Sequence, residues 1–298
     1  MIRSYRDCAW GCPGRGWIMG ILKRWVVGAA FAVSFFAHAI GAVSAQPAPG
    51  IVGHRGLMRH APENTLAGFA ACMNLRLGFE LDIRRTKDGV LVCLHDDDVK
   101  RTTNGNGLMA DFTLAELQKL DAGRWFSADF AGERVPTLEA VFALMKANTR
   151  GSQSPGLVCL DIKFEDATLA GEVVGMAKKH GVLQSVLLIG LTIEDPKLRA
   201  KLKACNPKTP VAVLANQREN LAKALEDRDA DWIYVRFIPT ADEVRTIHGM
   251  GKRVLLSGKL SGGHEPENWQ GARNAGVDAL LTDYPLECQR LWRAGKQK

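Results

Sequence analysis

Short apolar segments alternate with helix candidates along most of the chain. Strand candidates occur at 157–163, 185–190, 210–214, 232–235, 253–256 and 279–282, and helix candidates at 167–180, 196–204, 218–227, 241–250 and 267–275. Repeated strand–helix units that cover most of one chain indicate a parallel sheet closed as a barrel. We therefore predict a single-domain α/β fold of the TIM type, a (β/α)8 barrel, with functional residues at the carboxyl ends of the strands.

The N-terminal segment has the composition of a secretory signal. Lys23-Arg24 precedes an apolar stretch, 25–40, and a run of small residues ends at Ala45. This order predicts cleavage after Ala45, with Met19 as a candidate for the true start. An uncleaved anchor is the alternative, although the apolar stretch is slightly short for a membrane span. We expect the mature protein in the periplasm or outside the cell, without a stable membrane span.

Signal cleavage would leave a chain of suitable size for one barrel. Residues 46–50 would form a short leader and residues 51–298 the barrel domain, close to the roughly 250 residues usual for this fold. The formal net charge of +7 would fall to +3, because the first 45 residues hold five basic residues and one acidic residue. This mild positive charge suits a small anionic substrate and indicates no nucleic-acid or membrane partner.

Two acidic residues near position 80 are spaced to bind one cation. Side chains alternate between the faces of a strand, so Glu80 and Asp82 would point to the same side. Phe79, Leu81 and Ile83 would bury the opposite side. Two carboxylates on one face can bind a hard cation such as calcium or magnesium through oxygen, whereas a solvated strand face is the alternative.

A second strand candidate, 90–94, follows closely and ends at His95. Lys87-Asp88-Gly89 is a turn sequence, and the six residues between the two strands are too few for a helical crossover. We therefore expect a β-hairpin. A turn centred on Lys87 and Asp88 would place His95 opposite Glu80.

A histidine and an arginine, His54 and Arg55, close the short apolar strand candidate 50–53. An arginine guanidinium suits phosphate oxygens, and a histidine takes or gives a proton near neutral pH. A satisfied core histidine is the usual alternative, but two histidines in this chain each close an apolar segment. Glu63 and Asn64 precede a helix candidate, 65–75, where Asn64 would either face an anion or cap the helix.

The strand candidate 157–163 repeats this pattern, because it carries Asp161 near its end and Lys163 two residues later on the same face. Asp161 would complete a site with three carboxylates, and Lys163 would neutralise a phosphate oxygen. A surface ion pair is the alternative.

Nine short motifs, in order, resemble those of the glycerophosphodiester phosphodiesterases over roughly residues 51–290. They are His54-Arg55-Gly56, Pro62-Glu63-Asn64-Thr65, Glu80-Leu81-Asp82, Thr86-Lys87-Asp88-Gly89, His95-Asp96, Arg101-Thr102-Thr103, Pro136-Thr137-Leu138, Asp161-Ile162-Lys163 and Thr282-Asp283-Tyr284-Pro285. The resemblance implies a variant TIM barrel with an insertion after the strand of the second histidine, here about 97–134, with a helix at 113–120.

The resemblance also implies a reaction, the metal-dependent hydrolysis of a glycerophosphodiester to glycerol 3-phosphate and an alcohol. By family analogy His95 would be the acid and His54 the base. The nucleophile would be either the neighbouring 2-hydroxyl of glycerol, giving a cyclic intermediate, or water. The implied site comprises Glu80, Asp82 and Asp161 for calcium or magnesium, His54 and His95 as the acid/base pair, Arg55 and Lys163 for the phosphate, and Glu63 and Asn64 as supporting residues.

Two other functions compete with this one. Phospholipases D of the sphingomyelinase type and phosphatidylinositol-specific phospholipases C share this barrel, and a relative of these would act on lysolipids or sphingolipids. The other alternative is a periplasmic binding protein that has lost catalysis. Every charged position that the family's pattern expects holds a residue able to act in catalysis, and this favours an enzyme.

Two positions depart from the family's pattern. Asp161 stands where the family generally has Glu, which would place its carboxylate about 1.5 Å farther from the ion. Ser257-Gly258 stands where many relatives have Trp-Thr, so the substrate pocket lacks an aromatic wall unless Trp269 or Trp125 replaces it. The preferred metal and the alcohol group of the substrate stay open at this point.

Five cysteines would survive signal cleavage, and they form neither a disulfide framework nor a zinc site by their number and spacing. Two of them, Cys93 and Cys159, lie two residues before a candidate site residue. We expect both to point inward beneath the site, as packing residues or, if their strands are adjacent, as a disulfide. The five are Cys72, Cys93, Cys159, Cys205 and Cys288.

Overall fold

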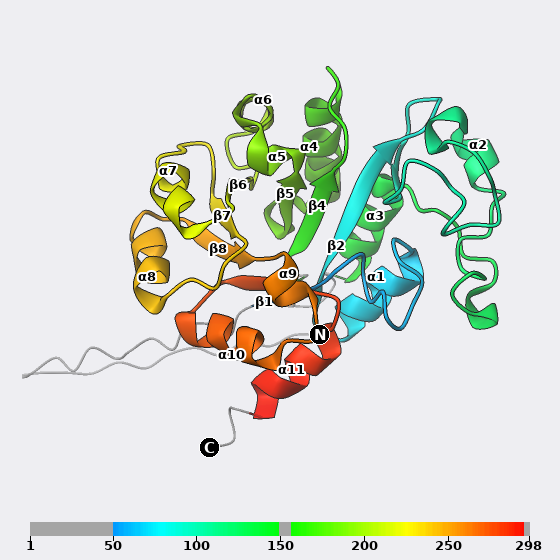
Figure 1. The fold of residues 1–298 in the computed structure, drawn as a ribbon. Helices are drawn as coiled ribbons and strands as arrows, with labels where there is room; N and C mark the ends of the chain where they lie inside the picture. The colour runs from blue at the N-terminus through cyan, green and yellow to red at the C-terminus, as the bar shows by residue number, and fades with distance from the viewer. Residues whose placement is uncertain (1–49, 149–155, 295–298) are drawn as a thin grey trace, which may run out of the picture. The chain divides into compact units, whose positions relative to one another are not determined.

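The computed structural model describes residues 50–148 and 156–294, which form the predicted α/β barrel (Figure 1). Its parallel strands follow the order β5-β4-β2-β1-β9-β8-β7-β6, and a bridge between Leu188 and Val211 brings β5 beside the start of β6. The barrel is therefore nearly closed. Its eight strands are β1 (Gly50–Gly53), β2 (Gly78–Arg85), β4 (Val158–Ile162), β5 (Val186–Gly190), β6 (Ala212–Ala215), β7 (Trp232–Val235), β8 (Arg253–Leu256) and β9 (Ala279–Thr282).

Helices follow the strands and cover the outside of the barrel, which confirms the predicted alternation in a single domain (Figure 1). The sequence reasoning missed four of them, the longer helices α3 and α11 and the short helices α5 and α9. No helix in the described ranges is long and apolar enough to cross a membrane. The longer helices are α1 (Leu66–Asn74), α3 (Leu138–Asn148), α4 (Leu169–His180), α6 (Pro196–Cys205), α8 (Ala241–Gly249), α10 (Pro266–Ala275) and α11 (Pro285–Ala294), and the short ones are α2 (Leu114–Leu117), α5 (Leu191–Glu194), α7 (Leu221–Leu225) and α9 (Lys259–Gly262).

The predicted signal segment, 1–45, lies outside the described residues. The predicted leader, 46–50, lies outside them too, except for Gly50, which begins β1.

Alternation along the strands divides the apolar core into two layers. On β2, Phe79, Leu81 and Ile83 pack outward under the helices, where the Phe79 ring stacks on Phe69 of α1 with 4.6 Å between centroids. A second cluster fills the inside of the barrel, with Val52 and Leu187 among its members. The inward positions of the same strands are left for polar side chains where each strand ends.

The predicted hairpin is present, but its register differs by one residue. β3 (Leu91–Cys93) runs antiparallel to the end of β2 with Cys93 opposite Ile83, so the same register places His95 opposite Leu81 and not opposite Glu80. The reason lies in the turn. A bond from Thr86 N to Val90 O closes a three-residue loop whose last residue, Gly89, has a φ of 90°, a conformation that glycine tolerates.

This shift corrects the placement of one cysteine. Moving the pairing by one residue moves a side chain to the other face of the strand. Cys93 therefore packs with Ile83 in the outer layer, whereas Cys159 lies inside the barrel as predicted. Both are free thiols, as are the other described cysteines, so the disulfide that we considered does not form.

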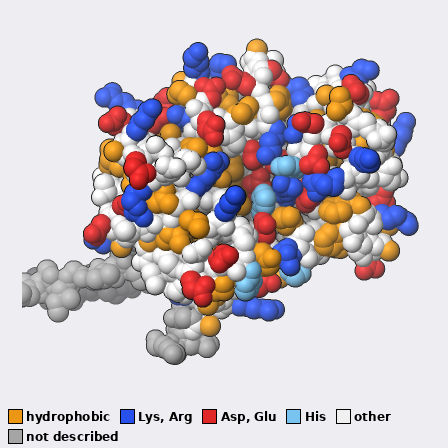
Figure 2. Space-filling view, in the orientation of Figure 1, with side chains coloured by type: hydrophobic (Ala, Val, Ile, Leu, Met, Phe, Trp, Pro, Cys, Tyr) orange, Lys and Arg blue, Asp and Glu red, His pale blue; other side chains and the backbone are white. Residues whose placement is uncertain are grey.

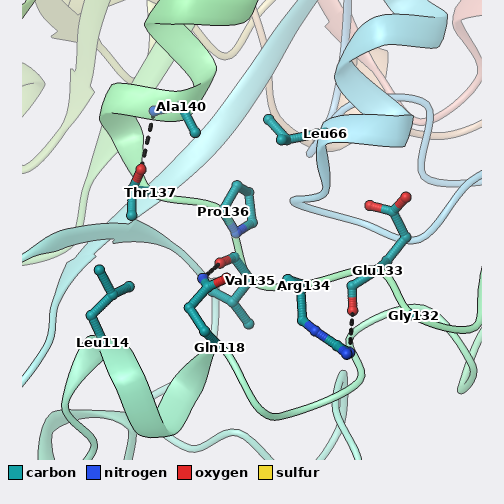
Figure 3. Close-up of a pocket in the computed structure, with 10 residues that line it drawn as sticks. All are labelled: Leu66, Leu114, Gln118, Gly132, Glu133, Arg134, Val135, Pro136, Thr137 and Ala140. Carbon is teal, nitrogen blue, oxygen red and sulfur yellow. Dashed lines mark hydrogen bonds between the residues drawn. The ribbon is translucent and has the colours of Figure 1, made fainter.

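The predicted insertion lies between β3 and α3 and has a small core of its own, in which Val99, Met109 and Leu117 pack beneath Leu94. Its helix α2 is shorter than the predicted 113–120. A pocket of about 500 Å³ lies between the insertion and the start of α3. Figure 3 shows the residues that line it. None of the predicted site residues lines it; its lining is Leu66, Leu114, Gln118, Gly132, Glu133, Arg134, Val135, Pro136, Thr137 and Ala140.

Candidate active site

The three predicted metal ligands come together at the carboxyl ends of β2 and β4. Asp82 lies opposite Asp161 in the parallel register of these strands, and Glu80 lies two residues before Asp82 on the same inward face. One carboxylate oxygen of each residue lies within 4.8 Å of one of each of the others. Glu80 and Asp82 are each only 1% exposed. Asp161, although one methylene shorter than glutamate, is part of this cluster.

Burial and mutual repulsion make this cluster electrostatically costly. Burial, together with the charge of Asp82, raises the pKa of Glu80 to about 8, and burial also raises the pKa of Asp161. Burial acts in the same direction on Asp82, but the ammonium group of Lys163 and a hydrogen bond from Asn64 hold the pKa of Asp82 below its usual value. Three carboxylates that face one another at this distance favour a positive ion between them.

Lys163 supplies part of that positive charge. Its Nζ lies 2.8 Å from Asp161 Oδ2 and 2.9 Å from Asp82 Oδ1. The ammonium group is the one described group that contacts buried Asp82 Oδ1, which accepts no further hydrogen bond from the described residues. A set of carboxylate oxygens, one of them buried and contacted by an ammonium group alone, fits a hard divalent cation such as calcium or magnesium.

His54 follows β1 and is held by a residue that the sequence reasoning quoted but gave no role. Its Nδ1 lies 2.7 Å from Asp283 Oδ1, just beyond the end of β9, and its Nε2 lies 4.0 Å from Glu80 Oε2. Burial alone would lower the pKa of His54, but the bond to Asp283 and the charge of Glu80 raise it overall. With Nδ1 bonded to Asp283, Nε2 is the ring nitrogen on the side of the carboxylates.

Arg55 turns toward the carboxylates with a backbone φ of 51°. Its backbone N–H donates to Glu80 Oε2 at 2.8 Å, and its Nη1 donates to Glu63 Oε1 at 3.0 Å. Its Nε lies 3.6 Å from Asp82 Oδ2 and has no hydrogen-bond acceptor among the described residues. The predicted phosphate arginine is therefore at the cluster, with one buried donor unsatisfied.

Asn64 orients one of the metal-ligand candidates. Its Nδ2 donates to Asp82 Oδ2 at 2.8 Å, and its Oδ1 accepts from the backbone N–H of Asp82 at 3.1 Å. The helix cap is Thr65, whose hydroxyl accepts from the N–H of Gly68, so the capping alternative for Asn64 is wrong. Asn64 instead leaves Asp82 Oδ1 as the oxygen available to other partners.

His95 lies two residues beyond β3 and has a carboxylate partner of its own. Its Nδ1 lies 2.7 Å from Asp96 Oδ1, and Arg101 of the insertion donates to both Asp96 and Glu63. The bond from Arg101, followed by that of His95, holds the pKa of Asp96 well below its usual range. The charge of His95 also acts on Asp161, which places the ring within electrostatic reach of the carboxylates. Sequence reasoning missed the roles of Asp96 and Arg101, although both occur in quoted motifs.

Gly190, at the end of β5, is a further residue that sequence reasoning missed. Its φ is 72°, and a Cβ at this position would lie 2.2 Å from Asp161 Oδ1. Only glycine leaves the Asp161 carboxylate room to face the cluster.

Of the two tryptophans considered as a replacement wall, Trp269 is buried and does not form one. Trp269 is 1% exposed, packs in the core and donates its Nε1–H to the carbonyl of Ser261. Trp125 is 39% exposed and lies in the insertion. Ser257 accepts a hydrogen bond of 2.8 Å from the hydroxyl of Tyr234 instead.

Figure 2 shows histidine, acidic and basic side chains gathered around a hollow in the centre of the viewed face. The residues that meet there can bind a cation, hold a phosphate and move protons. All nine predicted site residues contribute to one connected set of contacts.

Comparison with known proteins identifies one family. The model of the glycerophosphoryl diester phosphodiesterase family matches residues 54–287. A candidate glycerophosphodiester phosphodiesterase of Bacillus subtilis (strain 168) is 55% identical over 248 residues, which cover 79% of this chain and 94% of that protein. The glycerophosphodiester phosphodiesterase of Caldanaerobacter subterraneus is 54% identical over 256 residues, which cover 82% of this chain and 98% of that protein.

Solved structures have the same fold. A phosphodiesterase of Oleispira antarctica, solved with its product sn-glycerol-3-phosphate, superposes with a TM-score of 0.67 and 25% identity, covering 83% of this chain and 97% of that one. A glycerophosphodiester phosphodiesterase of Agrobacterium tumefaciens superposes with a TM-score of 0.68 and 24% identity, covering 83% of this chain and 99% of that one.

Proposed function

This chain belongs to the glycerophosphoryl diester phosphodiesterase family and is a glycerophosphodiester phosphodiesterase, and we propose that a divalent cation and two histidines carry out its reaction. The observation that carries the proposal is the position of Glu80, Asp82 and Asp161, which gather their oxygens within 4.8 Å of one another beside His54. The products would be glycerol 3-phosphate and an alcohol, in keeping with the product named for the Oleispira structure.

A phosphodiester resists hydrolysis because its negative charge repels nucleophiles and its alkoxide leaving group is poor. Glu80, Asp82 and Asp161 would hold calcium or magnesium, which supplies Lewis-acid stabilisation of the charge on the phosphate oxygens. Arg55 and Lys163, both in contact with these carboxylates, would add donors to the same oxygens.

His54 and His95 would transfer the protons. Each is bonded through Nδ1 to a carboxylate, Asp283 or Asp96, and such a bond fixes the tautomer and leaves Nε2 for the reaction. We expect His54 to take the proton of the nucleophile and His95 to protonate the departing alcohol. The nucleophile is either the neighbouring 2-hydroxyl of glycerol or water, and trapping of a cyclic phosphate would identify the former.

We also propose that the enzyme acts in the periplasm or outside the cell, after cleavage behind Ala45. The charged, apolar and small residues of the first 45 positions support this. Mass spectrometry of the mature N-terminus tests it, and a mature chain that still begins at Met1 or Met19 would contradict it.

The reaction itself is tested with purified mature protein, first treated with a chelator. We expect no release of glycerol 3-phosphate from glycerophosphocholine in excess chelator, and recovery with calcium or magnesium. Full activity in chelator would contradict the metal proposal. Cleavage of lysophosphatidylcholine but not glycerophosphocholine would assign the enzyme to the lysolipid class, and failure on every diester would favour a binding protein.

A further inference from the structure

The barrel places one arginine across its mouth from the carboxylates. In the ring of strands, β7 is four strands from β2 in either direction, so the two lie opposite each other. Trp232 and Tyr234 of β7 face the inside of the barrel. Arg236 follows β7 directly, and strand alternation gives it the same inward side at the level where the strands end.

Neutral groups hold Arg236 in place. Its Nη1 donates to Asn216 Oδ1 at 3.1 Å, just beyond β6, and its Cζ lies 5.8 Å from the centroid of the Tyr234 ring. Its aliphatic part runs beside Gly258, where an added Cβ would lie 3.3 Å from Arg236 Cγ. The glycine with its φ of 95° therefore leaves room for the arginine stem.

Unlike Arg55 and Lys163, Arg236 has no carboxylate partner among the described residues. Arg55 pairs with Glu63, and Lys163 pairs with Asp82 and Asp161. Within the described residues no Asp or Glu forms an ion pair with Arg236, whose side chain is exposed. Its charge and most of its donors are available to a ligand that enters the mouth.

A glycerophosphodiester joins glycerol and a second alcohol through one phosphate. Only the glycerol is common to all substrates of this class. With the phosphate beside β1, β2 and β4, one of these two alcohols would extend toward β7 on the far side. A planar guanidinium binds carboxylate or phosphate through two parallel hydrogen bonds, and these are stronger than bonds to neutral groups.

We propose that Arg236 is a specificity-determining residue that favours glycerophosphodiesters whose alcohol carries a second anionic group, a carboxylate or a phosphate. The proposal rests on the proposed function, because it assumes that the phosphate binds at the carboxylate cluster. It assigns the recognition of the departing alcohol to the side of the mouth opposite the carboxylate cluster.

The test uses two substrates that differ by one carboxylate, glycerophosphoserine and glycerophosphoethanolamine. The wild-type enzyme should have the higher kcat/KM for the serine diester, and Arg236→Gln should lower the serine-to-ethanolamine ratio about tenfold, the loss expected for a charged hydrogen-bonded pair. Arg253→Gln is the matched control. Arg253 is also exposed and lies 5.5 Å over the Trp232 ring, but at the start of β8, away from the mouth, so its ratio should stay at the wild-type value.

Each other outcome overturns the proposal. If the serine-to-ethanolamine ratio is unchanged in Arg236→Gln, or if the wild type does not prefer the serine diester, Arg236 does not recognise the alcohol. An equal loss on both diesters means that it contacts the common glycerol or has only a structural role. If neither diester is hydrolysed, the proposed function fails. The dissociation constants of the two uncleaved diesters, measured by calorimetry for the wild type and Arg236→Gln, then replace kcat/KM in the serine-to-ethanolamine ratio.

Discussion

The two halves of the barrel mouth differ in the side chains that they bring together, which are mostly charged in one half and mostly apolar in the other. The half formed by β9, β1, β2 and β4, together with the hairpin and insertion, brings six carboxylates against three permanent cations and two histidines. The half formed by β5 to β8 places apolar side chains such as Ile189 inside the barrel, above which Tyr234 bonds to Ser257. The carboxylates are Glu63, Glu80, Asp82, Asp96, Asp161 and Asp283, and the cations are Arg55, Arg101 and Lys163.

In the half that holds the carboxylates, the fold is less stable than it would be with apolar residues at the same positions. Two nearly inaccessible carboxylates of β2 face a third, and their burial favours protonation of Glu80. A purely structural core would not contain such a cluster, because buried charges are costly unless paired. The half from β5 to β8 has no such conflict. Substitutions at the carboxylate cluster should therefore lower activity, whereas substitutions in the half from β5 to β8 should lower stability and leave activity nearly unchanged.

The sharpest test of this contrast is Glu80→Gln. Loss of a charged metal ligand should lower kcat/KM about 10⁴-fold, since the bound cation is expected to supply several kcal/mol of transition-state stabilisation. Activity on glycerophosphocholine with calcium or magnesium measures this. Glu139→Gln, an exposed position on α3, is the control and should keep wild-type activity.

The same variant should change how stability depends on pH. The folded-state pKa of Glu80, about 8, lies above its ordinary value of 4.5. The folded state therefore binds more protons than the unfolded state between these values, and the free energy of unfolding falls as the pH rises through this window. In chelator, Glu80→Gln should remove part of this fall, roughly 2 kcal/mol. A pH dependence equal to that of the wild type would mean that the folded protein does not raise the pKa of Glu80.

The third prediction concerns the histidines, which belong to the same half. His54→Ala and His95→Ala should each lower kcat about 10³-fold by removing a proton carrier. His180→Ala, at the end of α4 beside Glu139, is the control and should stay within about twofold of wild type. Near-normal turnover in both active-site variants would break the assignment of acid/base chemistry to this half.

Sequence reasoning predicted what depends on short-range pattern. The spacing of Glu80 and Asp82 fixes a common face, and apolar segments that end in polar residues place His54 and Asp161 at one end of the barrel. The roles of Asp283, Asp96 and Arg101 depend on pairs formed between strand ends or with the insertion. These residues occur in recognisable motifs, but no local pattern says which partner each one binds.

The hairpin shows how a local rule fails by one residue. A two-residue and a three-residue turn both suit Lys87-Asp88-Gly89, and the choice shifts every later pairing by one. That shift moved Cys93 to the outer layer. His95 lies two residues beyond the end of β3, where its Nδ1 bonds to Asp96 and its charge acts on Asp161.

Gly190→Ala tests the boundary between the halves, because β5 pairs directly with β4. The added methyl would collide with Asp161 Oδ1, so metal affinity and kcat/KM should fall about 30-fold, and stability by about 1 kcal/mol or more. Gly181→Ala is the matched control, since its φ is 73° but its Cβ would meet nothing within 4 Å. It should lose stability but no metal affinity, which calcium titration by calorimetry measures. Equal metal affinity in the two variants would show that Gly190 does not position Asp161.

The smallest effect on activity is expected from Tyr234→Phe, in the half from β5 to β8. The ring stays in place beneath Arg236, and only the hydroxyl that donates to Ser257 is lost. Activity on glycerophosphocholine should remain within about twofold, whereas the free energy of unfolding should fall by about 1 kcal/mol because the buried Ser257 hydroxyl loses its partner. Ser257→Ala should cost a similar amount, and the double variant less than the sum of the two. A loss of activity beyond about tenfold in Tyr234→Phe would contradict the assignment of the chemistry to one half, because the reaction would then depend on both halves of the mouth.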